Sequence, residues 1–305
     1  MPQYTRRETC RSPHRRSPSS WWSFVLVVAH PQKGQVLDMS YDFDENTLFW
    51  PGSRSFDLTI LSRGPADGLD WLEMNWFSTP EHGGTHMDAP AHISEGKYRV
   101  GDIPIDKLVG PAVRVDISEQ AEADRDYVMT VDDLRAWEAA HGEIPEGAIL
   151  FVYTGWGALY PDREAYFGSA RNDTYLDEQG ESLLHFPGVA PSAATWLVKN
   201  RAVAGLGIDT PSIDHGPSPT FMTHQILFAD NVYALENVAK LDQLPATGAR
   251  AYALPINIAE GSGAPARIVA VFHEMGTSGA TAPSIAYCTL AQFIIVALLC
   301  VYSII

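Results

Sequence analysis

Short apolar segments alternate with amphipathic segments along most of this chain of 305 residues. Apolar runs that are bounded by Gly, Pro or Asp predict buried strands at residues 110–117, 148–154, 202–208 and 268–272. Two other stretches repeat their apolar residues at helical spacing. Residues 130–141 open with the N-cap candidate Thr130, and residues 191–200 open with Pro and Ser. Alternating strands and helices predict an α/β or α+β domain.

This pattern extends over residues 30–275 without a Ser/Gly-rich linker or an internal repeat, which favours one domain of that extent. The net charge of −16 argues against nucleic acid as a partner, because binding to phosphates requires Lys and Arg. The three cysteines are Cys10, Cys288 and Cys300, all close to the chain ends. This position excludes a disulfide-stapled core and a Cys-rich zinc module.

The two ends differ from the middle. Residues 1–29 are basic and then apolar, which is typical of a secretory signal with a long first part; the alternative is an unfolded leader. Residues 276–284 are small and polar, and residues 285–305 carry no charge, as in a glycolipid (GPI) attachment signal. A retained membrane anchor is the alternative for this tail, because it is about long enough to span a bilayer. These ends predict the secretory route and a cell-surface or extracellular location, with the cytoplasm as the alternative.

Three of the ten histidines fall within the eleven residues 82–92. On an extended segment His82, His86 and Asp88 share one face, because side chains alternate along a strand. Gly83-Gly84 permits the bend that brings the two imidazoles close enough to share one ion. Two imidazoles and a carboxylate are ligands that Zn²⁺, Mn²⁺ or Fe²⁺ prefers.

His92 follows Pro90, which is expected to end the strand and turn the chain. We therefore expect His92 close to the metal but off the ligand face, where an acid–base group is useful.

The motif His82-x-Gly-Thr-His86-x-Asp88-x-Pro90-x-His92 resembles the signature of the cyclase family of metal-dependent hydrolases, and all seven of its specified positions are present. That family includes bacterial-type kynurenine formamidases and isatin hydrolases. The resemblance extends over residues 36–272 and includes the turn Trp50-Pro51-Gly52. It implies the family's fold, an α/β swivelling β/β/α cyclase-type domain with mixed sheets around a metal site, usually assembled as homodimers or higher homo-oligomers.

The resemblance also implies the roles of site residues. In the family a later His and a Glu twelve residues beyond it complete the site, and His224 and Glu236 have this separation. The implied ligands for one or two ions of Zn²⁺ or Mn²⁺ are His82, His86, Asp88, His224 and Glu236. The implied proton shuttle is His92.

The function that this resemblance predicts is an arylformamidase that hydrolyses N-formylkynurenine to kynurenine and formate in tryptophan breakdown. Trp50 and Trp156 are the predicted substrate-binding residues, with Trp76 and Phe77 as further candidates for an aromatic wall around an aryl amide. An isatin hydrolase or another cyclic-amide hydrolase is the alternative. An alternative of another class is a membrane-tethered protein that holds metal without turnover, against which the intact His92 speaks.

Overall fold

The computed structural model describes residues 34–272. The predictions for the basic leader and for the apolar tail fall outside the described residues and stay predictions. Within residues 34–272, none of the helices has the length and apolar character needed to cross a membrane.

Eight strands form one mixed sheet in the order β1-β12-β11-β5-β7-β9-β10-β4, and an additional pairing of β4 with β12 closes the sheet into a barrel. The strands from β5 through β7 and β9 to β10 are parallel, and the other pairings are antiparallel. Their bounds are β1 Gln35–Asp38, β4 His86–Asp88, β5 Val109–Asp116, β7 Ile149–Tyr153, β9 Gly205–Ile208, β10 Tyr233–Glu236, β11 Ala249–Pro255 and β12 Gly263–Phe272. The predicted strands correspond to β5, β7, β9 and β12, although β12 starts five residues earlier than expected.

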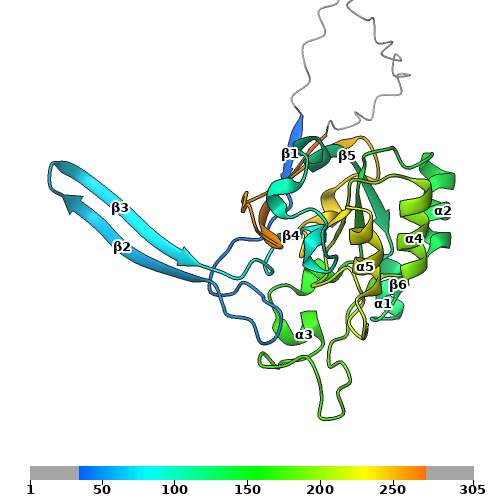
Figure 1. Ribbon diagram of the computed structural model, residues 1–305, viewed down its shortest axis with the longest axis horizontal. Coiled ribbons are helices and arrows are strands. Elements are labelled where there is room, and N and C mark those ends of the chain that lie inside the picture. The colour runs from blue at the N-terminus through cyan, green and yellow to red at the C-terminus, as the bar shows by residue number, and fades with distance from the viewer. Residues whose placement is uncertain (1–33, 273–305) are drawn as a thin grey trace, which may run out of the picture. The chain divides into compact units, whose positions relative to one another are not determined.

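Helices lie against the parallel half of the sheet, where Figure 1 shows α2, α4 and α5 side by side. Their bounds are α1 Ser118–Ala123, α2 Val131–His141, α3 Arg163–Phe167, α4 Pro191–Asn200 and α5 Met222–Ala229. The two predicted helices are confirmed as α2 and α4, and the Thr130 side chain caps α2 by accepting a hydrogen bond from the backbone N–H of Asp133. Short 3₁₀ helices cover Pro90–His92, Val100–Asp102, Ile105–Leu108, Trp156–Leu159 and Leu241–Gln243.

Strand β7 shows why its apolar run is continuous. Ile149 and Phe151 belong to one buried cluster, which is built from strands all round the barrel. Leu150 and Val152 belong to a second cluster, which the strands share with α2, α4 and α5. Both faces of the strand are therefore buried, as is usual for parallel sheets covered by helices.

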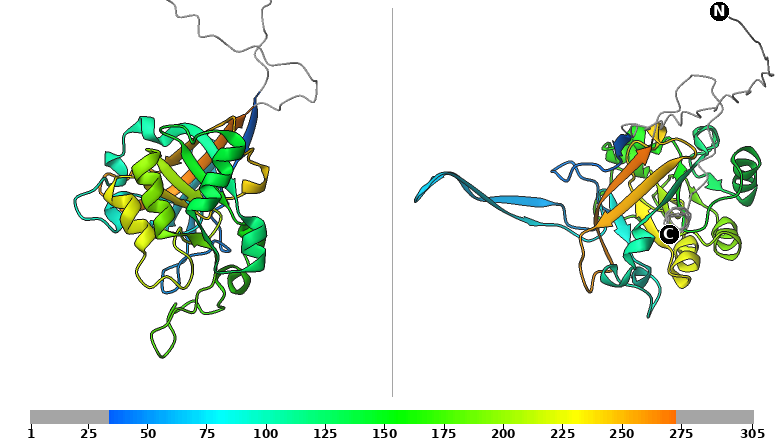
Figure 2. Two further views of the ribbon diagram at one scale, coloured as in Figure 1. Left: turned by 90° about the vertical axis from the view of Figure 1, so that its right-hand side faces the viewer. Right: turned by 90° about the horizontal axis from the view of Figure 1, so that it is seen from above.

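Two small sheets stand outside the barrel. Strands β6 Val128–Met129 and β8 Gly188–Val189 form a short parallel pair. Strands β2 Asp57–Ala66 and β3 Leu69–Ser78 form an antiparallel hairpin that extends away from the barrel and the helices (Figure 1, Figure 2). Trp76 and Phe77 lie on this hairpin and are 63% and 53% exposed, so neither belongs to the pocket wall of its own chain.

Candidate metal centre

Strand β4 lies between β10 and β12, and it is the element on which the site is built. His86 and Asp88 are two residues apart and both point into the site, as their shared parity predicts. The register of β4 with β10 places Glu236 directly opposite His86. The His86 Nε2 atom consequently lies 3.1 Å from Asp88 Oδ1 and 3.5 Å from Glu236 Oε2.

The regular strand starts only at His86, because the chain bends sharply at Gly83-Gly84. These glycines have φ values of +151° and +54°, which L side chains rarely adopt. A Cβ atom on Gly84 would also lie 2.8 Å from the Phe43 ring. The bend returns His82 to the site, where its Nδ1 atom lies 2.6 Å from Asp88 Oδ1.

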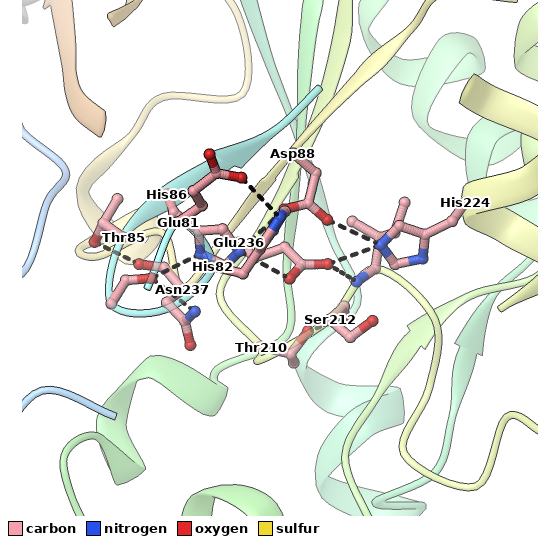
Figure 3. A network of polar contacts seen from close by, with 12 residues as sticks. Glu81, His82, Thr85, His86, Asp88, Thr210, Ser212, His224, Glu236 and Asn237 are labelled. Carbon is pink, nitrogen blue, oxygen red and sulfur yellow. Dashed lines mark hydrogen bonds and ion pairs between the residues drawn. The ribbon is translucent and has the colours of Figure 1, made fainter. Parts of the chain in front are cut away.

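Helix α5 supplies the remaining imidazole. His224 Nε2 lies 3.1 Å from Glu236 Oε1 and 3.4 Å from Asp88 Oδ2 (Figure 3). The five side chains named as ligands by the resemblance therefore converge in two groups that share Asp88. One group is His82, His86 and Asp88, and the other is Asp88, His224 and Glu236.

The spacing of the His86 and His224 nitrogens from the carboxylates fits divalent cations, whereas the 2.6 Å between His82 Nδ1 and Asp88 Oδ1 is a hydrogen-bond distance. Nitrogen and oxygen atoms that share one zinc ion at about 2.0–2.2 Å lie roughly 3.0–3.5 Å from each other. The separations of the His86 and His224 Nε2 atoms from the carboxylate oxygens are 3.1 to 3.5 Å. Asp88 faces both groups with different oxygens, which is the arrangement that lets one carboxylate serve two ions.

The buried negative charge of the two carboxylates also favours a bound cation. Asp88 and Glu236 are 2% and 5% exposed, and all their ion-pair partners in residues 34–272 are imidazoles. Burial lowers the pKa of His86, but its contacts with these carboxylates reverse the effect and raise the pKa to about 8. Without a metal, protons on the imidazoles must therefore balance the buried carboxylates.

Hydrogen bonds on the far side of two imidazoles select the nitrogen that faces the site. His86 Nδ1 donates to the backbone carbonyl of Gly84 at 3.0 Å. His224 Nδ1 donates to the buried carboxylate of Asp214 at 2.7 Å, and the backbone N–H of His224 donates to the same carboxylate. The Nε2 atoms of both rings are thereby left to bind a cation.

The His82 ring has the opposite orientation, with Nδ1 rather than Nε2 towards the ligand cluster. The Ser262 hydroxyl donates to Glu81 Oε2 at 2.7 Å, so its oxygen is free to accept the N–H of His82 Nε2 at 2.9 Å. We assign these proton positions from the network of donors and acceptors. Nδ1 is then the His82 atom that faces Asp88 and the cation site.

His92 is the last residue of the 3₁₀ helix that begins at Pro90, and its ring stacks on the His82 ring with centroids 3.9 Å apart. The residue as a whole is exposed to solvent. Partial burial in the pocket lowers the pKa of His92 to about 4, with the carboxylate of Asp88 acting in the opposite direction. His92 is therefore neutral at pH 7 and able to accept a proton.

A pocket of about 370 Å³ opens onto the ligands. Its aromatic walls are Trp50, Phe167, Tyr175 and Phe221, with Trp50 in ring contact with the other three. The structure places Trp156 elsewhere. Its indole is 9% exposed, lies outside the pocket lining and donates to the backbone carbonyl of Tyr166.

Sequence reasoning missed the residues that orient the ligands. Asp214 follows a predicted buried strand closely, and an acidic residue at that place was the available signal. Ser262 lies 180 positions from His82, and no local pattern connects the two. Phe221 was also missed; it adopts a left-handed backbone conformation with φ of +50° directly before α5 and lines the pocket.

The fold and the site together define a mixed α/β protein in which two groups of His, Asp and Glu side chains that could hold metal ions line a pocket with aromatic walls. Residues 37–215 match the sequence model described as "Putative cyclase". The chain is 34% identical over 244 residues to the isatin hydrolase of Roseibium aggregatum, which covers 77% of this chain and 86% of that protein. The chain belongs to the cyclase family.

Two further relatives agree with this assignment. The structure of isatin hydrolase A from Ralstonia solanacearum superposes with a TM-score of 0.70 at 33% identity, over 79% of this chain and 92% of that chain. The kynurenine formamidase of Geobacillus thermodenitrificans is 27% identical over 79% of this chain and 98% of that protein. The resemblance that the His82–His92 motif carried, and the mixed α/β fold that it implied, are confirmed.

Proposed function

We propose that this protein is a metal-dependent hydrolase that opens the amide bond of a small cyclic aryl amide of the isatin type. The observation that carries this proposal is the convergence of five His, Asp and Glu ligands at an aromatic pocket of about 370 Å³. Pockets of this size suit small organic molecules. The similarity to isatin hydrolases, at 33–34% identity over more than three quarters of the chain, favours a cyclic amide.

The pocket walls hold the substrate by its ring. Trp50, Tyr175 and Phe221 offer aromatic faces and edges on which a planar bicyclic ring can stack or pack edge to face. Ser212 and Asn237 also line the pocket and are polar, and Asn237 directly follows the ligand Glu236. A ring held in this way directs its amide carbonyl towards the cluster of ligands.

A divalent cation held by His82, His86 and Asp88, or by Asp88, His224 and Glu236, would supply an activated water molecule and polarise the carbonyl group. His92 supplies the proton transfer. Its neutral imidazole accepts the proton that the attacking water loses, and it returns that proton to the amide nitrogen as the C–N bond breaks. The product of a cyclic amide then carries a carboxylate and an aryl amine on one molecule.

N-Formylkynurenine is the second candidate, because kynurenine formamidases match the chain over nearly their whole length. The same residues serve both reactions, since each breaks an amide C–N bond beside an aryl ring. We rank this substrate second because these relatives have the lower identity to the chain, 24–27%.

The experiment is to measure hydrolysis of isatin and N-formylkynurenine by the full chain with Zn²⁺ or Mn²⁺, and then with a chelator. We expect chelator-sensitive turnover with isatin as the faster substrate. In His92→Ala we expect a loss of about 10²- to 10⁴-fold in kcat, the usual contribution of an acid–base group. The matched control is His141→Ala, because His141 is an exposed histidine at the end of α2.

Faster turnover of N-formylkynurenine would reverse the order of the two substrates. If a folded, metal-loaded protein hydrolyses neither compound, both substrates are wrong and the metal-holding protein without turnover becomes the better explanation. An equal loss in His141→Ala would show that His92→Ala acts through stability rather than through proton transfer.

A further inference from the structure

Asn237 directly follows the ligand Glu236 at the end of β10, where the chain leaves the strand with a left-handed φ of +52°. This conformation is uncommon for L residues, although Asn adopts it more readily than most. The residue is only 3% exposed, and a buried residue in such a conformation points to a functional constraint. Figure 3 shows Asn237 in the same network of polar contacts as the ligands His86 and Glu236.

Every polar group of Asn237 has a partner. Its backbone N–H donates to the carbonyl of Thr210 at 3.0 Å, and its backbone carbonyl accepts from the Thr85 hydroxyl at 2.7 Å. In the side chain, Nδ2 donates to the backbone carbonyl of Gly84 at 2.8 Å, and Oδ1 accepts from the Tyr166 hydroxyl at 2.9 Å. The amide must have this orientation, because the Gly84 carbonyl can only accept.

The Gly84 carbonyl connects Asn237 to a ligand. The same oxygen accepts from His86 Nδ1 at 3.0 Å, so its two lone pairs serve one imidazole and one amide. We propose that Asn237 is a positioning residue, which fixes the Gly84 carbonyl and thereby directs His86 Nε2 at the cation site. The proposal rests on the metal dependence of the proposed function and adds a residue on which that dependence relies.

Tyr166 holds the Asn237 amide in place. It belongs to α3, is fully buried and directly precedes Phe167, which lines the pocket. Its hydroxyl proton is shared between Asn237 Oδ1 and the backbone carbonyl of Asp209, which lies 2.8 Å away. Burial raises the pKa of Tyr166 well above its ordinary value, so the hydroxyl keeps the proton that it donates. The support of His86 therefore extends from α3, through the Asn237 amide, to the bend before β4.

The test is the affinity of the full chain for Zn²⁺, measured by titration calorimetry. In Asn237→Gly we expect a loss of about 10- to 100-fold, the usual effect of removing a group that orients a metal-binding histidine. Glycine suits the left-handed backbone, so this variant removes the amide without adding strain. The matched control is Lys240→Gly, since Lys240 is exposed and has a similar φ of +55°. We expect it to keep the natural affinity.

Tyr166→Phe tests the second link, because it keeps the buried ring and removes only the hydroxyl. We expect a smaller loss of Zn²⁺ affinity of about 2- to 10-fold, which corresponds to one ordinary hydrogen bond. If the hydroxyl acts through the Asn237 amide, Tyr166→Phe should cause no further loss in a chain that already carries Asn237→Gly. Losses that add in the double variant overturn the link between Tyr166 and Asn237.

The visible absorption of bound Co²⁺ separates positioning from stability. Zn²⁺ has a filled d shell and gives no such spectrum, whereas that of Co²⁺ depends on the number and geometry of its ligands. At saturating Co²⁺ we expect an altered spectrum in Asn237→Gly and the natural spectrum in Lys240→Gly. A natural affinity in Asn237→Gly, or a lower affinity with the natural spectrum, overturns the proposal alone. A natural chain that binds neither cation overturns the proposed metal dependence as well.

Discussion

At the scale of single residues, each of three imidazoles faces the cation site with one ring nitrogen, while the other ring nitrogen is held by a hydrogen bond. The hydrogen-bond partner is different in each case. A backbone carbonyl holds His86, a buried carboxylate holds His224, and a hydroxyl holds His82. The hydroxyl of Ser262 can accept from His82 only because its own proton is directed at Glu81. This side-chain relay is the least rigid of the three supports, since Glu81 is 37% exposed at its side chain.

Removal of the Ser262 hydroxyl therefore tests how far the orientation of His82 matters. In Ser262→Ala the Nε2–H loses its acceptor, and either ring nitrogen can carry the proton. We expect the affinity for Zn²⁺ to fall by about 10- to 100-fold, the usual effect of removing a partner of a metal-binding histidine. Titration calorimetry with Zn²⁺ measures this change directly.

The conservative variant Ser262→Thr keeps the hydroxyl and should keep most of the affinity. The packing around the adjacent Gly263 is tight, since a Cβ atom added there would lie 2.4 Å from the His82 ring. Equal losses of affinity in both variants would therefore mean that this packing, rather than the hydrogen bond, explains the effect.

At the scale of elements, the bend before β4 decides whether His82 reaches Asp88 at all. Gly84 combines a left-handed backbone with close packing against Phe43 and Thr47. The left-handed conformation costs an L residue about 1–2 kcal/mol, and the clash adds to it. We expect Gly84→Ala to lower the free energy of unfolding by about 2–4 kcal/mol.

Gly96→Ala is the matched control, since Gly96 has φ of +74° with no atom within 4 Å of an added Cβ. Urea denaturation of both variants separates the backbone strain, which they share, from the packing, which only Gly84 has. A loss no larger in Gly84→Ala than in Gly96→Ala would show that the bend tolerates a side chain.

The elements also show where sequence patterns suffice. Strand β7 was predictable because both of its faces are buried, so all of its residues are apolar. Strand β5 was predictable because only two of its residues, Arg114 and Asp116, are charged. Strands β4 and β10 are only three and four residues long and carry ligands, so polar side chains interrupt their apolar pattern. The hairpin of β2 and β3 was missed because it buries neither face within its own chain, so burial imposes no alternation on its residues.

At the scale of the whole molecule, closure of the barrel assembles the site. The motif of residues 82–92 could be interpreted locally, because its spacing places ligands on one face. Glu236 reaches His86 through a register 150 residues away in sequence, which no local periodicity contains. Its role was accessible only through the family resemblance, and that of Ser262 was not accessible at all.

The same assembly predicts how the molecule depends on its cation. The five ligands come from β4 and the bend before it, from α5 and from β10, so a bound ion joins elements that separate on unfolding. At a cation concentration 100 times the dissociation constant we expect about 2.7 kcal/mol of stabilisation. For a domain of this size that raises Tm by about 5–10 °C, and a chelator should reverse it.

The size of this effect should grow with pH. In the cation-free protein His86 has a pKa raised to about 8, so its proton stabilises the folded state at pH 6.5 and below, and this contribution is lost as the pH rises through 8. A proton and a cation compete for the same nitrogen. The chelator-induced fall in Tm, measured by calorimetry, should therefore be larger at pH 8 than at pH 6, and Asp88→Asn/Glu236→Gln should show no such fall at either pH. A fall in Tm that is independent of pH, or that persists in the double variant, would place the stabilising cation elsewhere in the chain.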